Sequence, residues 1–230
     1  MSIPVLEFFL RYLGRRGCMD AASHGLNEWI DGFLFVGNRP ILDLLNTKPV
    51  LAGGPTELLS DVRALERWLI ASGTVSSVKD KAVVRGWRNA AEAEVFLEQL
   101  IGFRERLRDA VVRMESGMPP SDAFLFEVNS LLMQYPRHTS LRKRDGKVIR
   151  ETLVELREPA DLWAPIAEAT AELLTETDSS RIRQCESCVV HFVDTSKNGS
   201  RRWCSMNICG NRLKVASYQR RKRASVAQAG

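Results

Sequence analysis

Four of the five cysteines in this 230-residue chain are grouped near its C-terminus, at a spacing suited to a metal ion. Cys185, Cys188, Cys204 and Cys209 read Cys-x2-Cys-x15-Cys-x4-Cys, while Cys18 stands alone. Zinc prefers four ligands in a tetrahedron, and thiolates suit it well. Since four thiolates leave no open position for water, the spacing predicts one structural Zn²⁺ rather than a catalytic one.

Three alternatives for this cluster are less favoured. Two unrelated pairs of buried cysteines would leave a short segment with few large apolar residues and nothing to hold it folded. A redox Cys-x-x-Cys normally lies at a helix N-terminus in a larger α/β domain. His191 lies three residues after Cys188 and is a conceivable ligand, but we interpret it as an ordinary surface or hairpin histidine beside better-spaced cysteines.

The residues between and after the cysteine pairs indicate how the site is built. Val189–Val193 and Arg201–Cys204 are expected to form two strands joined by a turn over 195–200, which is rich in Ser, Asn and Gly. A helix is expected over Asn211–Arg223. A knuckle, a hairpin and a helix after the last ligand form a treble-clef-like finger, and a ribbon-like finger with a third strand is the alternative.

Charge is distributed unevenly along the chain. Residues 181–230 hold 11 Lys+Arg against 2 Asp+Glu, whereas residues 1–180 hold 22 against 26. A basic end on an acidic body predicts a nucleic acid, an anionic surface or an acidic protein as partner. We expect the phosphate contacts to come from basic residues of the finger and its helix, with Trp203 and Tyr218 as stacking candidates. These basic residues are Arg201, Arg202, Arg212, Lys214, Arg220, Arg221, Lys222 and Arg223.

A structural interpretation competes with the functional one for some of these residues. Zn²⁺ with four thiolates carries a formal −2 charge, which nearby cations would offset. Arg201, Arg202 and Arg212 are placed to do this, and one of them could pair with Asp194. The run Arg220–Arg223 is too far along the chain for that role, and is either a phosphate clamp or a solvated helix end that suits the helix dipole.

Composition places the chain among ordinary globular proteins. Hydrophobic residues make up 44% and charged residues 27%, which excludes a wholly disordered, collagenous or coiled-coil chain. No apolar run reaches the ~18 residues of a membrane span, so we expect no membrane association. Residues 1–18 make a poor signal peptide, and Met19 is an alternative start. With few cysteines outside the cluster, a cytoplasmic protein with reduced thiols is expected.

The rest of the chain predicts an α+β fold, with a mostly helical body and a small antiparallel sheet. Asp145-Gly146 suits a type I′ turn and gives the clearest hairpin signal. The expected elements are a strand over 32–36, a helix from Thr56 or Ser60 to Ala71, a helix over 90–116, a helix from Ser121 or Asp122 to about Tyr135, a hairpin of 139–143 with 147–156, and a helix from Asp161 to about 178. Domains are expected at 1–30 (an N-terminal extension), 31–180 (the body), 181–223 (the finger with its basic helix) and 224–230 (a disordered tail).

Polar groups in the body have both functional and structural interpretations. Asp43, Asn46 and Thr47 lie in an apolar stretch, where they could line a small-molecule pocket, but capping or satisfying local backbone is the favoured role. The cluster Arg142–Arg144 with Lys147 could extend a basic face, and we favour an exposed turn. Arg104, Arg106 and Arg108 alternate with acidic residues, as on a solvated helix face.

The finger motifs resemble the CGNR zinc finger family. They are Cys185-x-x-Cys188, Phe192-x-Asp194-x-Ser196, Arg201–Ser205 and Cys209-Gly-Asn-Arg-x-Lys214. The body resembles the ABATE domain that precedes this finger in bacterial proteins, on Leu-Asp-Leu-Leu-Asn-Thr at 42–47 and a helix ending in Trp68-Leu69 before Gly73. The resemblance implies a zinc-binding protein that acts as a stress-related transcription regulator or binds RNA.

Three functions follow from these observations. The first is a regulator whose body senses a small molecule or forms a homo-oligomer, and whose finger binds DNA or RNA. The second is a protein–protein adaptor with a purely structural finger. The third, an enzyme, is not expected, because the chain has no P-loop, dinucleotide glycine motif or nucleophile elbow and only three histidines. The sequence does not distinguish DNA from RNA.

Overall fold

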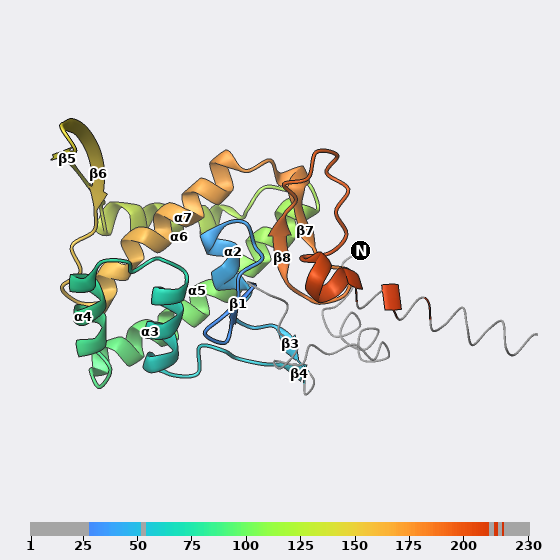
Figure 1. Cartoon of the computed structure of the whole chain (residues 1–230), viewed down its shortest axis with the longest axis horizontal. Coiled ribbons are helices and arrows are strands. Elements are labelled where there is room, and N and C mark those ends of the chain that lie inside the picture. Colours follow the sequence, from blue (N-terminus) through green and yellow to red (C-terminus); the bar gives the residue numbers. More distant parts are fainter. Residues whose placement is uncertain (1–27, 52–53, 212–213, 216–217, 219–230) are drawn as a thin grey trace, which may run out of the picture.

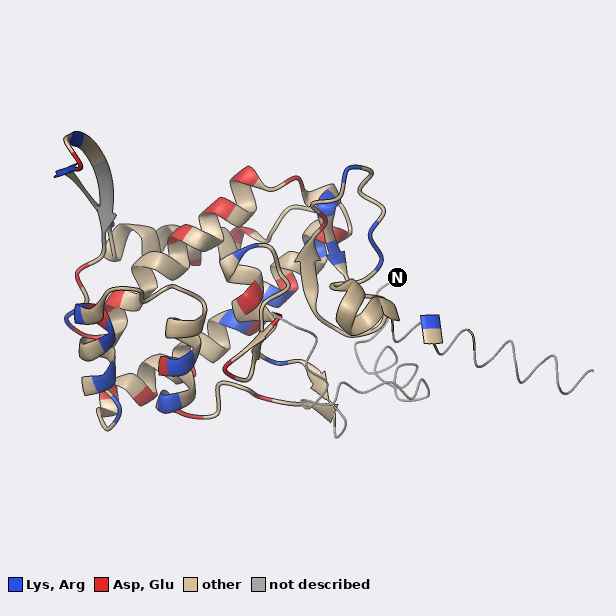
Figure 2. Cartoon of the chain, viewed as in Figure 1, with Lys and Arg blue, Asp and Glu red and all other residues tan. Residues whose placement is uncertain are grey.

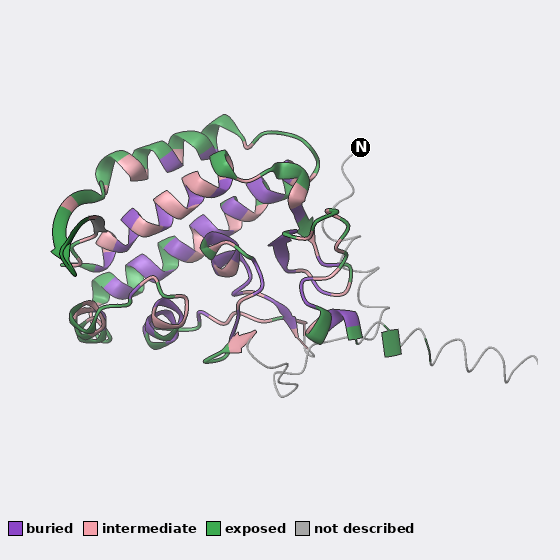
Figure 3. Ribbon diagram, turned by 45° about the horizontal axis from the view of Figure 1, so that its top comes forward, coloured by how far each residue is buried: buried purple, intermediate pink, exposed green. Residues whose placement is uncertain are grey.

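Three long helices form the centre of the molecule. A computed structural model describes residues 28–51, 54–211, 214–215 and 218. In it α5 (Ala91–Glu115), α6 (Asp122–Gln134) and α7 (Trp163–Glu176) pack together (Figure 1). Phe96 and Phe103 of α5 meet the edge of Trp163, with ring centroids 5.2 and 5.3 Å apart. The buried residues line the inward sides of these helices (Figure 3).

Several helices lie where the sequence pattern predicts them. The helix predicted over 90–116 is α5, and Ser121 caps α6 by accepting a hydrogen bond from the backbone N–H of Phe124. Gly117 follows α5 with a φ of 74°, a conformation that favours glycine. None of the helices among the described residues is both long and apolar enough to cross a membrane.

Other helices differ from the expectation. α3 (Val62–Ala71) is capped by Asp61 rather than by Thr56 or Ser60. α4 (Val78–Gly86) was not expected, because Val84 is its sole buried residue and its sequence carries no apolar stripe. α7 begins at Trp163, after a 3-10 turn over 159–162 that contains Asp161. α2 (Pro40–Leu45) occupies the stretch whose periodicity is ambiguous.

Two expectations about α5 are wrong. The helical pattern over 90–116 places Val95 on the apolar stripe with Leu97 and Leu100, but Val95 is 53% exposed. Arg104, assigned to a solvated face, is completely buried. Its guanidinium donates to the Thr47 hydroxyl at 2.9 Å and to the Glu57 carboxylate at 2.5 and 2.7 Å. Alternating charges along the sequence hide this because a buried arginine needs partners from distant segments, which local spacing does not reveal.

The strands form four antiparallel pairs among the described residues. β1 (Trp29–Ile30) pairs with β2 (Phe33–Leu34), β3 (Val50–Leu51) with β4 (Gly54–Pro55), β5 (His138–Arg144) with β6 (Lys147–Leu153), and β7 (Ile182–Gln184) with β8 (His191–Val193). The predicted hairpin turn is confirmed, since Asp145 and Gly146 have φ of 51° and 77°. β2 is shorter than the strand expected over 32–36. Small antiparallel pairs around a helical body confirm the α+β class.

The body and the finger share buried surface. Leu34 and Val36 pack with the four cysteines and Phe192, while Ile182 and Val193 pack into the core of the body. Trp29 and Leu51 also pack against the finger core. The boundary expected at 180 falls in a 3-10 turn over 179–181 that leads directly from α7 towards β7. The tail expected to be disordered, 224–230, lies outside the described residues.

Candidate metal centre and nucleic-acid interface

The four cysteines of the sequence motif come together in one buried cluster. The ligand atoms of Cys185, Cys188, Cys204 and Cys209 all lie within 4.8 Å of one another. The Sγ atoms of Cys188, Cys204 and Cys209 are 3.6 and 3.7 Å apart. A tetrahedral zinc site with Zn–S bonds of about 2.3 Å has S···S edges of about 3.8 Å. The cluster therefore fits one Zn²⁺, and these separations are far longer than the roughly 2.05 Å of a disulfide.

Hydrogen bonds among the four cysteine side chains shift their pKa values in different directions. Bonds from Cys188, Cys204 and Cys209 lower the pKa of Cys185, and the bond with Cys185 contributes most to raising the pKa of Cys188. All four side chains are buried, so the charge of four thiolates requires a cation. Metal binding meets that need by replacing the protons.

Short backbone loops position the sulfurs. The N–H of Cys185 donates to the carbonyl of Val190 at 3.0 Å, which closes the first knuckle. A π-helical turn over Met206–Gly210 carries Cys209. Ser205 caps that turn, because its hydroxyl oxygen accepts from the N–H groups of Asn207 and Ile208. Four residues of the helix expected over 211–223 belong to the described part of the chain, and all four are helical: Asn211, Lys214, Val215 and Tyr218.

The hairpin of the finger differs from the prediction. β8 pairs with β7, the strand before the first cysteine pair, with Ile182 opposite Val193. The segment 201–204, predicted as the second strand, is irregular. Asp194 holds the loop between β8 and the segment 201–204, because its carboxylate accepts from the N–H groups of Ser196 and Arg201, both at 2.8 Å. In β7 Ile182 is buried, Arg183 is exposed and Gln184 is half-buried, an alternation that three residues are too few to reveal in the sequence.

The body holds the finger through polar contacts to β8. The Asn46 side chain donates to the carbonyl of His191 at 2.8 Å and accepts from its N–H at 2.9 Å. The carbonyl of Gly37 accepts from the N–H of Val193, and the Asn38 amide donates to the carbonyl of Val193. The His191 ring, buried rather than on the surface, has Nδ1 2.7 Å from the Glu115 carboxylate of α5. His191 is not part of the cysteine cluster.

The three polar residues of the 42–47 motif thus bond to three different segments. Asp43 accepts from the N–H of Gly37 at 2.8 Å, and Thr47 accepts from Arg104. The local capping role holds for Asp43, whereas Asn46 bonds across the body–finger junction. Burial raises the pKa of Asp43 to about 6, although the backbone N–H groups of Gly37 and Val36 act in the opposite direction. Since these side chains already bond to protein, the pocket interpretation loses its support.

Two family models match the chain. One is ABATE, described as "Putative stress-induced transcription regulator", and it matches residues 38–177, more than half of the chain. The chain belongs to the ABATE family. The second model, the CGNR zinc finger, matches residues 181–222 and contains all four cysteines. Both resemblances expected from the sequence are confirmed. As an ABATE-family chain with a CGNR finger, it can hold one structural zinc ion. No curated protein matches the chain.

In this ABATE-family chain the guanidinium of Arg201 bonds to groups inside the finger. Its Nε donates to the carbonyl of Trp203 at 2.9 Å, and its Nη2 donates to the carbonyl of Cys204. The guanidinium also lies 5.0 Å from the centroid of the Phe192 ring. These contacts tie the second cysteine pair to β8, which favours the structural role for Arg201 over phosphate contact.

Arg202 and Lys214 lie on the surface. Arg202 is 63% exposed and forms a bidentate ion pair with Glu186 at 2.5 and 2.7 Å. Its pKa is raised, because it donates hydrogen bonds to the Glu186 carboxylate. Lys214 is exposed on the helix after Cys209. Arg212 and the run Arg220–Arg223 lie outside the described residues.

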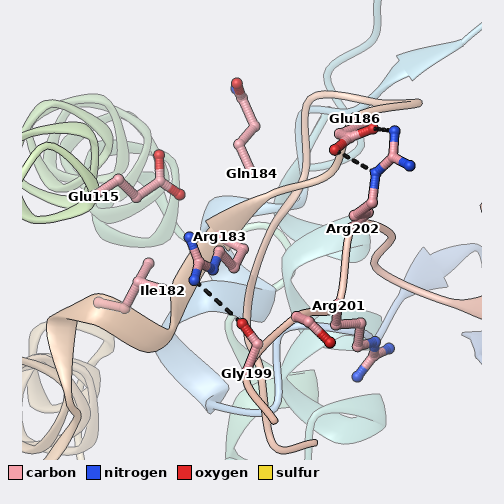
Figure 4. Close-up of a pocket in the computed structure, with 9 residues that line it drawn as sticks. Glu115, Ile182, Arg183, Gln184, Glu186, Gly199, Arg201 and Arg202 are labelled. Atoms are coloured by element: carbon pink, nitrogen blue, oxygen red, sulfur yellow. Dashed lines mark hydrogen bonds and ion pairs between the residues drawn. The ribbon is translucent and has the colours of Figure 1, made fainter.

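A cleft of about 400 Å³ lies on the finger and is bordered by Glu115 at the end of α5. Figure 4 shows that Arg202 and Glu186 point toward one another, that Arg183 points toward Gly199, and that Arg201 directs its guanidinium away from them. Arg183 and Lys197 are further exposed cations of the finger that were not among the expected phosphate contacts. Both lie in the basic stretch 181–230, and this excess of basic residues is the sequence signal that includes them.

Proposed function

We propose that the chain is a cytoplasmic, zinc-dependent transcription regulator that binds nucleic acid through its finger. The ligands of the zinc are Cys185, Cys188, Cys204 and Cys209, with their thiols reduced. Lys214 and Arg220–Arg223 contact phosphates, together with Arg183, Lys197 and Arg202 around the first knuckle. Zinc is structural, because four thiolates leave no open position for a reacting water, and the role is regulatory rather than enzymatic.

The observation that carries this proposal is the contrast in charge between finger and body. Exposed Arg183, Lys197, Arg202 and Lys214 surround a finger in which Glu186 and Asp194 are the acidic residues. Asp194 is buried and bonded to backbone, so it does not offset the surface cations. Acidic residues instead lie along α7 of the body (Figure 2). A polyanion is attracted to the finger and repelled by that helix. The family description supports the same function.

Salt dependence tests the phosphate contacts. Replacing Arg220, Arg221, Lys222 and Arg223 by Ala should weaken binding to every nucleic acid tested. Each lost contact flattens the slope of log affinity against log salt by about 0.9 on duplex DNA and about 0.7 on single strands. Zinc content, measured by elemental analysis, should stay at one per chain. A quadruple variant with the wild-type slope would remove these residues from the mechanism.

The Glu186–Arg202 ion pair offers an internal control. Glu186→Gln removes a negative charge beside Arg202 and frees its guanidinium, so affinity for nucleic acid should rise. Arg202→Ala should lower affinity, and Lys48→Ala, a cation of the body paired with Glu105, should leave it nearly unchanged. Affinities that shift equally in Arg202→Ala and Lys48→Ala would show that net charge alone matters.

Nuclease-controlled crosslinking in cells, followed by sequencing, determines whether the bound nucleic acid is DNA or RNA. Recovered DNA supports transcription regulation directly, and recovered RNA assigns the finger to transcripts instead. A stable protein complex that survives nuclease, with no nucleic acid recovered, would replace this function by the adaptor role.

A further inference from the structure

The β5–β6 hairpin is a basic arm that projects from an acidic body. Residues 138–153, the whole hairpin, contain five Lys and Arg against two acidic residues, Asp145 and Glu151. The rest of 1–180 holds 17 Lys+Arg against 24 Asp+Glu, because the whole segment holds 22 against 26. The arm therefore departs from the charge of its own domain, although it lies far from the basic end of the chain in sequence.

The arm contributes little to the packing of the body. Within the described residues, β5 and β6 make their extensive contacts with each other and not with the helices. Six of the seven residues of β5 are exposed. Leu141 and Val148, on one face of the hairpin, are 71% and 64% exposed. An isolated two-stranded hairpin is marginally stable in water, so its length of seven paired positions is not explained by the stability of the body.

The arm and the finger lie at opposite ends of the molecule (Figures 1 and 3). The root of the arm, at Tyr135, lines a cleft with Ala91 and Val95 at the start of α5. The finger contacts Glu115 at the end of α5. A helix of 25 residues is about 37 Å long, which is close to the 34–36 Å of one turn of B-form DNA.

We propose that the β5–β6 arm is a second nucleic-acid contact, which inserts into the major groove of a DNA duplex about one helical turn from the finger. The major groove, about 12 Å wide, admits a two-stranded β-ribbon. Lys143, Arg144 and Lys147 at the tip meet phosphates on either side of the groove, and Leu141 and Val148 face base edges. A-form RNA has a major groove too narrow for the ribbon. This inference rests on the proposed function and adds to it the form of the partner.

The test uses the full-length, zinc-loaded chain and a mixed-sequence DNA duplex of about three helical turns, alongside an RNA duplex of the same sequence. The arm variant is Lys143→Ala, Arg144→Ala, Lys147→Ala. The matched control is Arg63→Ala, Lys79→Ala, Lys81→Ala, which removes the same charge from α3 and α4. The arm variant should flatten the salt slope on DNA by about 2 to 3 units and the control by less than about one. Arm-dependent loss should be absent on RNA.

Every other result of this test either contradicts or supports the proposed role of the arm in DNA binding. Equal losses in the arm and control variants, or equal arm-dependent losses on DNA and RNA, would overturn it. Sedimentation that changes from dimer to monomer in the arm variant would assign the arm to a second copy of the chain. Wild type that binds neither duplex overturns the arm, and wild type that also binds no single strand contradicts the proposed function as well. Loss of binding in the arm variant, together with unchanged binding in the Arg220–Arg223 variant, supports the arm while removing Arg220–Arg223 from the proposed contacts.

Discussion

The side-chain amide of Asn46 forms two hydrogen bonds with the backbone of His191, 145 residues further along the chain. One amide thus satisfies both the N–H and the carbonyl of a residue in β8, at the junction of body and finger. Both residues are buried. This pair explains why an asparagine stands in the apolar stretch of 41–47.

Removing this amide should destabilise the docked finger. Asn46→Ala leaves two buried backbone groups without partners, which costs roughly 2 to 4 kcal/mol. Asn129→Ala, the same change on the exposed side of α6, should stay within about 0.5 kcal/mol. Urea unfolding of both zinc-loaded variants measures the difference. Equal free energies of unfolding for the two variants would contradict the role of Asn46.

Removing zinc should loosen part of the body as well as the finger. Structural zinc contributes about 10–16 kcal/mol in small fingers at neutral pH, and much of that energy is folding energy. Because Leu34 and Val36 pack against the cysteines, chelation should speed amide exchange over 33–37 together with 182–210. The first half of α5 should remain protected.

Hydrogen-exchange mass spectrometry with and without a chelator checks this expectation, and zinc add-back should restore protection. Exchange confined to 182–210 would show that the shared core does not depend on the metal.

Asp43 should make stability depend on pH. Its pKa of about 6 in the folded chain lies above its ordinary value of 3.8, so the folded state holds this proton more tightly. The contribution of Asp43 to stability is therefore full below about pH 4 and falls as pH rises towards and through 6. Asp43→Asn removes the titration and keeps an oxygen for the N–H of Gly37.

The difference in unfolding free energy between this variant and wild type should accordingly move in favour of the variant by about 1 to 3 kcal/mol between pH 4 and 7.5. Denaturation at a series of pH values, with zinc content checked at each because acid releases the metal, measures it. A difference that does not vary with pH would disprove the titration of Asp43.

Two arginines on α5 should differ widely in their contributions to stability. Arg104→Ala removes a completely buried cation and leaves Glu57 without its partner, which costs about 3 to 5 kcal/mol. Arg106 is 53% exposed and pairs with Glu127, so Arg106→Ala should cost less than about 1 kcal/mol.

Arg104→Met combined with Glu57→Met should recover much of the loss, because it removes both charges at once. Thermal melts of the three variants measure these differences. A double variant less stable than Arg104→Ala would show that the guanidinium is needed for its bond to Thr47 as well.

The parts of this fold that were predicted from sequence are those with local causes. The cysteine spacing, the apolar stripe of α5 and the turn at Asp145-Gly146 each determine structure within a short stretch. The pairing of β8 with β7 was missed, because three-residue strands carry too little alternation and the loop 195–200 suggested a hairpin of its own. The partners of Asn46 and Arg104 were missed since they come from segments 145 and 47 to 57 residues away.

The 3-10 turn between α7 and β7 has a mechanical consequence. A finger joined by a long flexible linker searches many orientations before it meets its target, and loses that freedom on binding. Here five residues, 177–181, separate the two elements, and β8 is bonded to the body. The orientation of the finger relative to the body is therefore set when the protein folds, so that binding to a target costs the finger little further orientational freedom.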